Sequence, residues 1–255
     1  IDSPALGTSR SDFSLLLPLS SYGLANPWAV EGPVGSVDPT PRRIPRVVHQ
    51  TYKDAGVPVK LLPLLESWSR RNPGWQRRFY TDKDCTRFVQ EEFPEYWDAY
   101  RGLAKDVERA DFFRYMVILR YGGVYADVDV ECRRPLESFI LPGDTMVVGW
   151  EAEQPNDVEA FNHHYVRKRQ VLQWFFAAAP NHPVLRAMCD HVASNVLTVF
   201  SNNTNIDTLE RTGPGPWTDF VLPPKDPYVG AAACPYGGSF KHKSTGSLSP
   251  RRQPG

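Results

Sequence analysis

Apolar residues recur with two different periods along the chain, and these periods predict strands and helices in alternation. A short apolar run that includes Val47 and Val48 predicts a first strand over residues 44–52. The next apolar residues are spaced as one face of a helix, at Leu61, Leu64, Leu65 and Trp68. The sequence Asn-Pro-Gly at residues 72–74 predicts the end of that helix, because proline and glycine interrupt helical structure.

A second strand and a capped helix are expected next. Residues 75–80 fit a strand, and Thr81 can cap the helix that follows. Asp84 lies three residues after Thr81, which is the spacing of a capping box with aspartate in place of glutamate. Phe88 and Val89 are expected among the buried residues of this helix.

A longer helix is expected over residues 105–121. Gly122 and Gly123 follow it, and glycine readily takes the left-handed conformation that ends many helices. Further strands are expected over residues 124–130 and 145–150. This alternation favours an α/β fold with a mainly parallel central sheet flanked by helices.

Composition separates the two ends of the chain from its middle. Residues 1–43 are rich in proline, glycine and serine and show no clear period, which predicts a stem or loosely ordered lead-in. Residues 249–255 are expected to form a disordered tail. The remaining residues, 44–248, are expected to form one domain, since a chain of 255 residues suits a single α/β domain.

Charge and cysteine content narrow the classes of partner. The chain has 29 basic and 29 acidic residues, so no basic excess indicates a nucleic-acid partner. The four cysteines form no CxxC pair, which disfavours a structural zinc site, but they leave two disulfides or buried thiols equally open. The sequence has no apolar run long enough for a membrane span, so membrane attachment is expected only through an N-terminal anchor absent from this chain.

Two aspartates mark the candidate site. On a strand over residues 124–130, Tyr125, Asp127 and Asp129 would share one face. Two carboxylates so close together need a counter-charge, and Mn²⁺ or Mg²⁺ is a suitable one. A metal at the C-terminal end of a strand could bind a diphosphate leaving group, as in transfer from a nucleotide sugar. Two ordinary surface aspartates would give the same pattern, so the neighbouring residues decide.

Charged residues on the preceding predicted helix strengthen the case. Asp111 and Arg114 are three residues apart and therefore share a face of the helix. They could form an ordinary surface ion pair. They lie, however, within the apolar stretch 110–119, where charged side chains are uncommon unless they are paired or have a function. Gly122 and Gly123 then turn the chain directly into the strand with the two aspartates.

This combination resembles a known family. Residues 110–115, Ala-Asp-Phe-Phe-Arg-Tyr, and residues 121–129, Tyr-Gly-Gly-Val-Tyr-Ala-Asp-Val-Asp, resemble glycosyltransferase family 32, the group with a DXD sugar-binding region. Residues 44–52 resemble the opening strand of that family. Gln173-Trp174 and residues 212–218 resemble its initiation-specific α-1,6-mannosyltransferase branch.

The resemblance implies a GT-A-type nucleotide-sugar-binding fold over residues 44–248 and retention of the anomeric configuration. It implies a catalytic role for Asp127 and Asp129, which would hold Mn²⁺ or Mg²⁺, with His242 as a further metal ligand. The side chains that it implies for donor binding are His49, Tyr52, Asp111, Arg114, Tyr125 and Asp127. Trp217, beside Gly215 and Pro216, is expected on the acceptor side, because aromatic faces pack on sugars.

The expected function is therefore a retaining, metal-dependent α-1,6-mannosyltransferase that moves mannose from GDP-mannose to an N-glycan acceptor. Its expected location is the Golgi lumen, as a type II membrane protein at full length. Three alternatives stay open. One is transfer to inositol phosphoceramide, and another is transfer from UDP-galactose or UDP-N-acetylglucosamine. The third is a non-catalytic sugar-nucleotide-binding domain, which the unusual Leu248 in the closing segment would favour.

Overall fold

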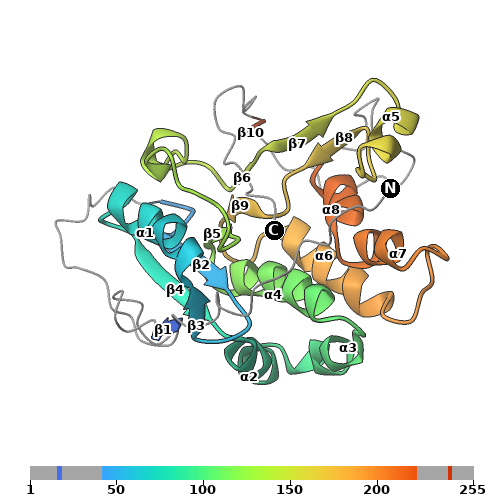
Figure 1. The fold of residues 1–255 in the computed structure, drawn as a ribbon, viewed down its shortest axis with the longest axis horizontal. Helices are drawn as coiled ribbons and strands as arrows, with labels where there is room; N and C mark the ends of the chain where they lie inside the picture. Colours follow the sequence, from blue (N-terminus) through green and yellow to red (C-terminus); the bar gives the residue numbers. More distant parts are fainter. Residues whose placement is uncertain (1–15, 19–41, 223–240, 243–255) are drawn as a thin grey trace, which may run out of the picture.

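A mixed six-stranded sheet forms the centre of the protein (Figure 1). The computed structural model describes residues 16–18, 42–222 and 241–242. The strand order is β10-β6-β9-β5-β2-β4. The strands are β2 (Val47–Thr51), β4 (Gln76–Tyr80), β5 (Gly123–Ala126), β6 (Met146–Val148), β9 (Phe175–Ala178) and β10 (Lys241–His242). β2 is parallel to β4 and β5, and β10 is parallel to β6, whereas β9 is antiparallel to both of its neighbours.

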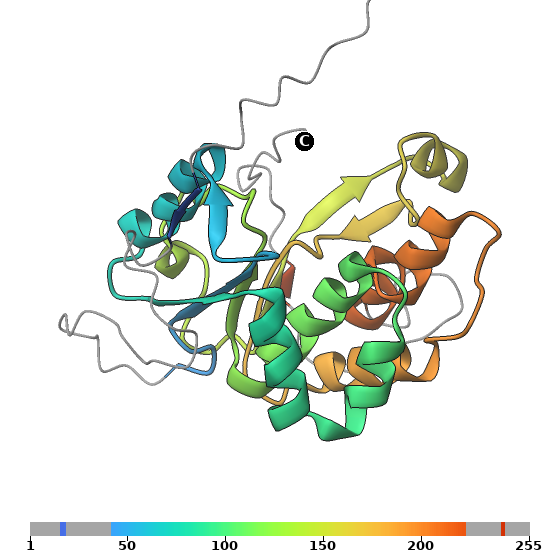
Figure 2. The ribbon, with the colours of Figure 1, turned by 60° about the horizontal axis from the view of Figure 1, so that its bottom comes forward.

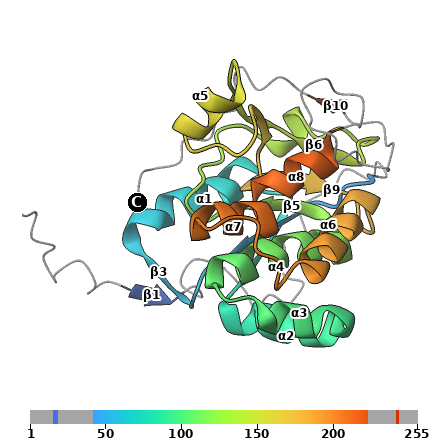
Figure 3. The same cartoon turned by 90° about the vertical axis from the view of Figure 1, so that its right-hand side faces the viewer.

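Helices cover both faces of the sheet, so the α/β class with a mainly parallel sheet flanked by helices is confirmed. The helices are α1 (Leu62–Arg71), α2 (Asp82–Glu92), α3 (Trp97–Gly102), α4 (Asp106–Tyr121), α5 (Asp157–Asn162), α6 (Pro183–Ser194), α7 (Thr204–Arg211) and α8 (Pro214–Val221). α2, α4 and α6 lie on one face of the sheet and α1 on the other (Figure 3). The 3-10 turns are η2 (Val59–Leu61), η3 (Pro94–Tyr96) and η4 (Leu136–Ser138).

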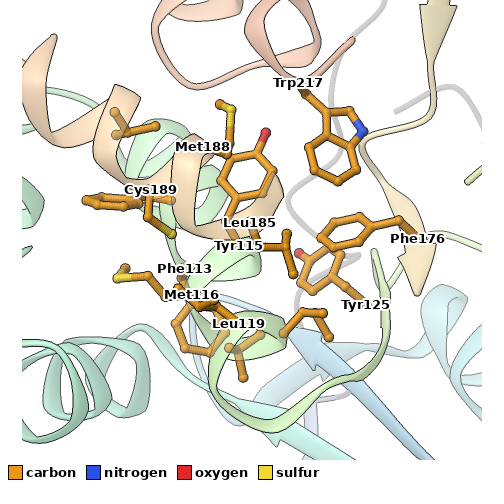
Figure 4. Packing of buried hydrophobic residues seen from close by; sticks show 14 of the residues in the cluster. Phe113, Tyr115, Met116, Leu119, Tyr125, Phe176, Leu185, Met188, Cys189 and Trp217 are labelled. Carbon is orange, nitrogen blue, oxygen red and sulfur yellow. The ribbon is translucent and has the colours of Figure 1, made fainter. Parts of the chain in front are cut away.

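Side chains of β5 alternate between two hydrophobic cores. Val124 and Ala126 pack with Trp68 of α1 in the core on the α1 side of the sheet. Tyr125 packs with Phe176 of β9 in the core on the α4 side, where the two rings lie beside each other (Figure 4). The alternation expected for residues 124–126 is therefore confirmed, and it places Tyr125 on the same face of the sheet as α4.

The helices expected from the sequence are present. The expected helix over residues 105–121 is α4, and the sequence spacing at 61–68 corresponds to α1. Thr81 caps α2: its hydroxyl accepts from the backbone N–H of Asp84, and the Asp84 carboxylate accepts from the backbone N–H of Thr81. The predicted capping box is therefore confirmed, aspartate included.

Two glycines join α4 to β5 in conformations that favour glycine. Gly122 has a φ of 64° and Gly123 a φ of 98°. A Cβ on Gly122 would lie 2.7 Å from the ring of Pro180, and one on Gly123 would lie 2.5 Å from Val47 of β2. The turn thus brings the end of α4 against β2, so that β5 pairs directly with it.

Two predicted strands end earlier than expected. The strand over residues 124–130 stops at Ala126, the last residue of β5 to pair with β9, and the chain then turns through residues 127–130. The strand over residues 145–150 ends at Val148 as β6. The chain then leaves the sheet as β7 (Trp150–Glu153), which pairs with β8 (Arg169–Val171) in an arm that carries α5 (Figure 2).

The N-terminal segment contributes one described strand. β1 (Leu16–Pro18) is antiparallel to β3 (Gly56–Pro58), so the expected lead-in contacts the domain at this point. The other residues before 42, and the expected tail 249–255, lie outside the described residues. No helix in the described part of the chain has the length and apolar character needed to span a bilayer.

The described cysteines are free. Cys85, Cys132 and Cys189 are buried thiols that form no disulfide with one another. Of the two alternatives left open by the sequence, these three residues therefore follow the buried-thiol one. Cys234 lies outside the described residues.

Candidate active site

A cavity of about 400 Å³ opens where β2 and β5 end. These strands are parallel neighbours, so their C-terminal ends meet at one edge of the sheet, which is where open α/β sheets bind ligands. The lining comes from the end of β2, from η2 and its flanks, from α4 and from the turn after β5. The lining residues are Thr51, Tyr52, Pro58, Lys60, Leu61, Ala110, Arg114, Tyr125, Asp127, Val128 and Asp129.

The two aspartates reach the cavity from a turn rather than from a strand. The expectation that Asp127 and Asp129 share a strand face is wrong, because β5 ends at Ala126. The backbone N–H of Asp127 donates to the carbonyl of Trp174 at 3.0 Å, and the N–H of Val130 donates to the carbonyl of Asp127 at 3.3 Å. These bonds fix the turn, and both carboxylate residues line the cavity, half-buried.

Arg114 links the two acidic parts of the predicted motif. Its Nη2 lies 2.9 Å from Oδ1 of Asp111 and 3.5 Å from Oδ1 of Asp127. The hydroxyl of Tyr125 donates to the same oxygen of Asp127 at 3.0 Å, and the guanidinium lies 5.0 Å from the centre of the Tyr125 ring. The structure therefore brings together Asp111, Arg114, Tyr125 and Asp127, and Asp129, the fifth residue that the sequence singled out here, lines the same cavity.

Burial shapes the charges of this group. Burial raises the pKa of Asp111 to about 6, although Arg114 and the hydroxyl of Thr212 oppose the rise. For Arg114, burial lowers the pKa, but Tyr125, Asp127 and Asp111 together raise it above its usual value. Arg114 is therefore a permanent positive charge, held by its neighbours at the wall of the cavity.

Lys60 adds a second positive charge that the sequence did not reveal. It lies on η2, directly after β3, and its exposed side chain lines the cavity. Residues 58–60 show no helical or strand period, so no pattern marked this lysine. Its position depends on how β3 and η2 fold against the end of β2.

The acidic residues of the cavity fit a metal that also binds substrate. Among the described residues, no three or more His, Cys, Asp and Glu side chains are placed to hold a metal ion together. Asp127 and Asp129 nevertheless supply two hard oxygen ligands at the cavity wall. Mg²⁺ is commonly bound by one or two carboxylates, with substrate phosphates and water completing its shell. His242 has its backbone in β10, paired with Val148, and its side chain lies outside the described part of the structure.

His49 is in the core rather than at the cavity surface. It is completely buried, with Nδ1 3.0 Å from the hydroxyl of Tyr80 and Nε2 3.1 Å from the carbonyl of Gly122. Burial and the nearby charge of Arg78 lower its pKa to about 3, so it is neutral at ordinary pH. The expectation that His49 contacts the donor is therefore wrong, because no part of its side chain is exposed. Tyr52, expected beside it, does line the cavity.

Trp217 is also a core residue. Its side chain is completely buried, and its indole N–H donates to the carbonyl of Leu172 at 2.8 Å. Its ring centre lies 4.7 Å from that of Phe176, within the core on the α4 side of the sheet (Figure 4). The expectation that Trp217 meets the acceptor is therefore wrong, because a buried ring offers no face to a sugar.

Residues 58–147 match the family described as the glycosyltransferase sugar-binding region containing a DXD motif. The matched segment begins at the cavity residue Pro58 and includes α4, β5 and the turn with Asp127 and Asp129. It therefore contains every lining residue of the cavity except Thr51 and Tyr52, which lie at the end of β2.

Several yeast mannosyltransferases are similar to this chain over more residues than the family segment 58–147. The chain is 29% identical over 203 residues to the initiation-specific α-1,6-mannosyltransferase of Candida albicans, covering 70% of this chain and 52% of the relative. It is 28% identical over 194 residues to the enzyme of the same name from Schizosaccharomyces pombe, covering 70% and 48%. It is 30% identical over 160 residues to inositol phosphoceramide mannosyltransferase 1 of S. pombe, covering 54% and 49%.

This chain thus spans about half the length of the curated relatives that it matches. The matched segment coincides with the site described above, since it carries both aspartates and Arg114. The predicted resemblance to glycosyltransferases with a DXD-containing sugar-binding region is therefore confirmed over residues 58–147, which carry the motif around Asp127 and Asp129.

Proposed function

We propose that the protein is a retaining α-1,6-mannosyltransferase that moves mannose from GDP-mannose to an N-glycan acceptor. The observation that carries this proposal is the cavity at the ends of β2 and β5, which combines two carboxylates with two cations. Similarity to α-1,6-mannosyltransferases of two yeasts supports the choice of mannose. A Golgi location, through an anchor outside this chain, belongs to the same proposal.

Asp127 and Asp129 would hold Mn²⁺ or Mg²⁺ at the cavity wall. A metal bound there supplies positive charge to the diphosphate, on which negative charge builds as the glycosidic bond breaks. Arg114 and Lys60 add positive charge from the protein itself. Because Arg114 is already held by Asp111 and Asp127, it needs little reorganisation when that charge develops.

The remaining lining residues suit the nucleoside part of a donor. Tyr52, Pro58 and Leu61 give one side of the cavity an apolar and aromatic character. Tyr52 and Leu61 pack against the small core that contains Val57, which fixes their position. A purine or pyrimidine ring could stack there, and Thr51 offers a hydroxyl nearby.

A second candidate function keeps the donor and changes the acceptor. The similarity to inositol phosphoceramide mannosyltransferase 1 favours transfer of mannose to the inositol headgroup of a ceramide. The site described above serves both functions, because metal and diphosphate contacts do not depend on the acceptor.

A transfer assay separates these functions. The protein is incubated with Mn²⁺ and either GDP-mannose or UDP-galactose, together with an N-glycan core oligosaccharide or inositol phosphoceramide. The proposal predicts an α-1,6-linked mannose on the oligosaccharide, with the linkage assigned by NMR. Transfer to the ceramide alone would establish the second candidate instead, and transfer from UDP-galactose but not GDP-mannose would contradict both.

A further inference from the structure

A polar stripe runs along one face of α4, on the side of the helix that meets α7 and α8. Glu108, Asp111 and Tyr115 lie at i, i+3 and i+7, so they share this face. All three side chains are buried. Buried polar groups need hydrogen-bond partners, and here the partners come from residues about a hundred positions later in the chain.

The first contact of the stripe anchors α7. Oε1 of Glu108 accepts from Nη1 of Arg211 at 2.7 Å and from the hydroxyl of Thr208 at 3.0 Å. Arg211 is itself buried, and Thr208 also accepts a bond from Lys105. The C-terminal half of α7 is therefore tied to the first turns of α4.

The second contact is made by Thr212, between α7 and α8. Its hydroxyl lies 2.9 Å from Oδ2 of Asp111 and 3.4 Å from the carbonyl of Thr208. The hydroxyl has one proton, and the shorter contact, to a carboxylate, is the stronger hydrogen bond. The other oxygen of Asp111 is the one that meets Arg114.

The carbonyl of Thr212 supports Arg114 by a second route. It accepts from the hydroxyl of Tyr115 at 2.9 Å and from Nε2 of Gln173 at 2.9 Å. The backbone carbonyl of Gln173 in turn accepts from Nη1 of Arg114 at 3.4 Å. Two of the supports of the guanidinium, Asp111 and Gln173, are thus held by the same residue.

We propose that Thr212 is a positioning residue for the donor site, which holds Asp111 and Gln173 so that Arg114 stays aimed into the cavity. This inference rests on the proposed function, in which Arg114 faces the diphosphate. Thr212 is completely buried and is not among the lining residues. Thr212 therefore acts without touching the cavity, because its hydroxyl contacts Asp111 and Asp111 contacts Arg114.

The test compares Thr212→Val with Thr212→Ser in donor turnover. Valine keeps the shape of the side chain but removes the hydroxyl, so Oδ2 of Asp111 loses the hydrogen bond from Thr212 and Arg114 can shift. Kinetics are measured with whichever donor, GDP-mannose or UDP-galactose, the wild type turns over. We expect Thr212→Val to lower kcat about tenfold or more while KM changes less than about threefold, because small misplacements of positioning groups cost rate. Thr212→Ser should retain kcat within about twofold.

Thr218→Val is the matched control. Thr218 is also a buried threonine, but its hydroxyl accepts from the backbone N–H of Val171 at 3.0 Å, outside the contacts of Arg114. This variant loses a buried hydrogen bond of its own, so it measures the effect of lowered stability alone. We expect its kcat at 20 °C to stay within about twofold of wild type.

Two further variants keep the test decisive. If Thr212→Val does not fold, Tyr115→Phe removes one bond to the Thr212 carbonyl, and we expect it to lower kcat with little change in KM. In an Arg114→Lys background, Thr212→Val should have much less effect than in the wild type, because both act through one group. Wild-type kcat in Thr212→Val, or an equal loss in Thr218→Val, would overturn the inference. If the wild type turns over neither donor, both the proposed function and the inference about Thr212 are overturned.

Discussion

Three polar side chains, His49, Asp111 and Arg114, are buried, and their neighbours decide how far burial changes the pKa of each. Burial favours the neutral form of a group, so it lowers the pKa of His49 and raises that of Asp111. Arg114 stays charged because Tyr125, Asp127 and Asp111 outweigh its burial. Thus the histidine serves the core as a neutral hydrogen-bonding group, and the arginine serves the cavity as a cation.

The first prediction concerns the pH dependence of stability. The pKa of His49 is about 3 in the folded protein, below its usual 6.5, so the unfolded chain binds a proton that the folded one excludes. The stability that depends on neutral His49 is therefore complete above pH 6.5 and is lost as the pH falls towards 3. This single group should lower the free energy of unfolding by up to about 1.4 kcal/mol per pH unit in that window.

Urea unfolding of wild type and His49→Gln between pH 7 and pH 4 checks this. Glutamine can replace part of the hydrogen bonding to Tyr80 and Gly122 without gaining a proton, so its loss of stability with falling pH should be shallower. His163→Gln, at a largely exposed histidine, serves as the control and should keep the wild-type slope. Equal slopes for wild type and His49→Gln would show that His49 is not kept neutral by the fold.

At the scale of elements, the turn between α4 and β5 sets the geometry of the site. Arg114 lies on the helix before the turn, and Tyr125 and Asp127 lie after it. Gly122 and Gly123 join the two in left-handed conformations, with Gly123 against β2. The distance between Arg114 and Asp127 therefore depends on a connection whose backbone conformation and close contacts favour glycine.

We predict that Gly123→Ala lowers the free energy of unfolding by about 2–4 kcal/mol. An alanine there would be strained at a φ of 98°, and its Cβ would lie 2.5 Å from Val47. Gly143→Ala is the matched control, since a Cβ at Gly143 meets no atom within 4 Å. Chemical unfolding of both variants gives the comparison, and equal stability of the two would contradict the role assigned to this turn.

The elements also show how far the sequence could predict the structure. The spacing of apolar residues predicted α1, the glycine pair predicted the end of α4, and the capping residues predicted the start of α2, because these signals are local. The end of β5 depends on where β9 stops pairing, and the antiparallel direction of β9 depends on the chain between β6 and β9. Neither the end of β5 nor the direction of β9 follows from the local spacing of hydrophobic residues. For this reason the strand with the two aspartates was predicted too long.

Within the site, the residues close to one another in sequence were predictable and the distant ones were not. Asp111 and Arg114 lie on α4, Asp127 and Asp129 lie in the turn directly after β5, and their spacing marked them. The contact of Thr212 with Asp111 crosses about a hundred residues and has no local signature. Aromatic character alone could not separate cavity residues from core residues, and for that reason Trp217 was placed wrongly.

At the scale of the whole molecule, the core on the α4 side joins the C-terminal helices to the sheet. Trp217 of α8 packs against Phe176 of β9 and Tyr115 of α4 (Figure 4). The ring of Tyr125 lies against Phe176 in the same core, and its hydroxyl reaches Asp127. Packing of α8 thus supports the site from inside the protein.

We predict that Trp217→Phe lowers the free energy of unfolding by about 2 kcal/mol, through lost packing and the lost bond to Leu172. The KM for the glycan acceptor should stay within about twofold of wild type, because the ring does not reach the surface. Thermal unfolding and acceptor kinetics measure the two effects separately. A large rise in acceptor KM with unchanged stability would restore the acceptor role that the structure removes.

The proposed function requires that the cavity bind a nucleotide sugar through a metal held by Asp127 and Asp129. Calorimetric titration tests it, with GDP-mannose and UDP-galactose each added in the presence of Mn²⁺ or of EDTA. We predict binding of GDP-mannose that requires Mn²⁺ and is lost in Asp129→Ala, while Asp98→Ala, at a largely exposed aspartate, binds as the wild type does. Binding of GDP-mannose that is unchanged by EDTA and by Asp129→Ala would contradict metal-dependent donor binding by these aspartates.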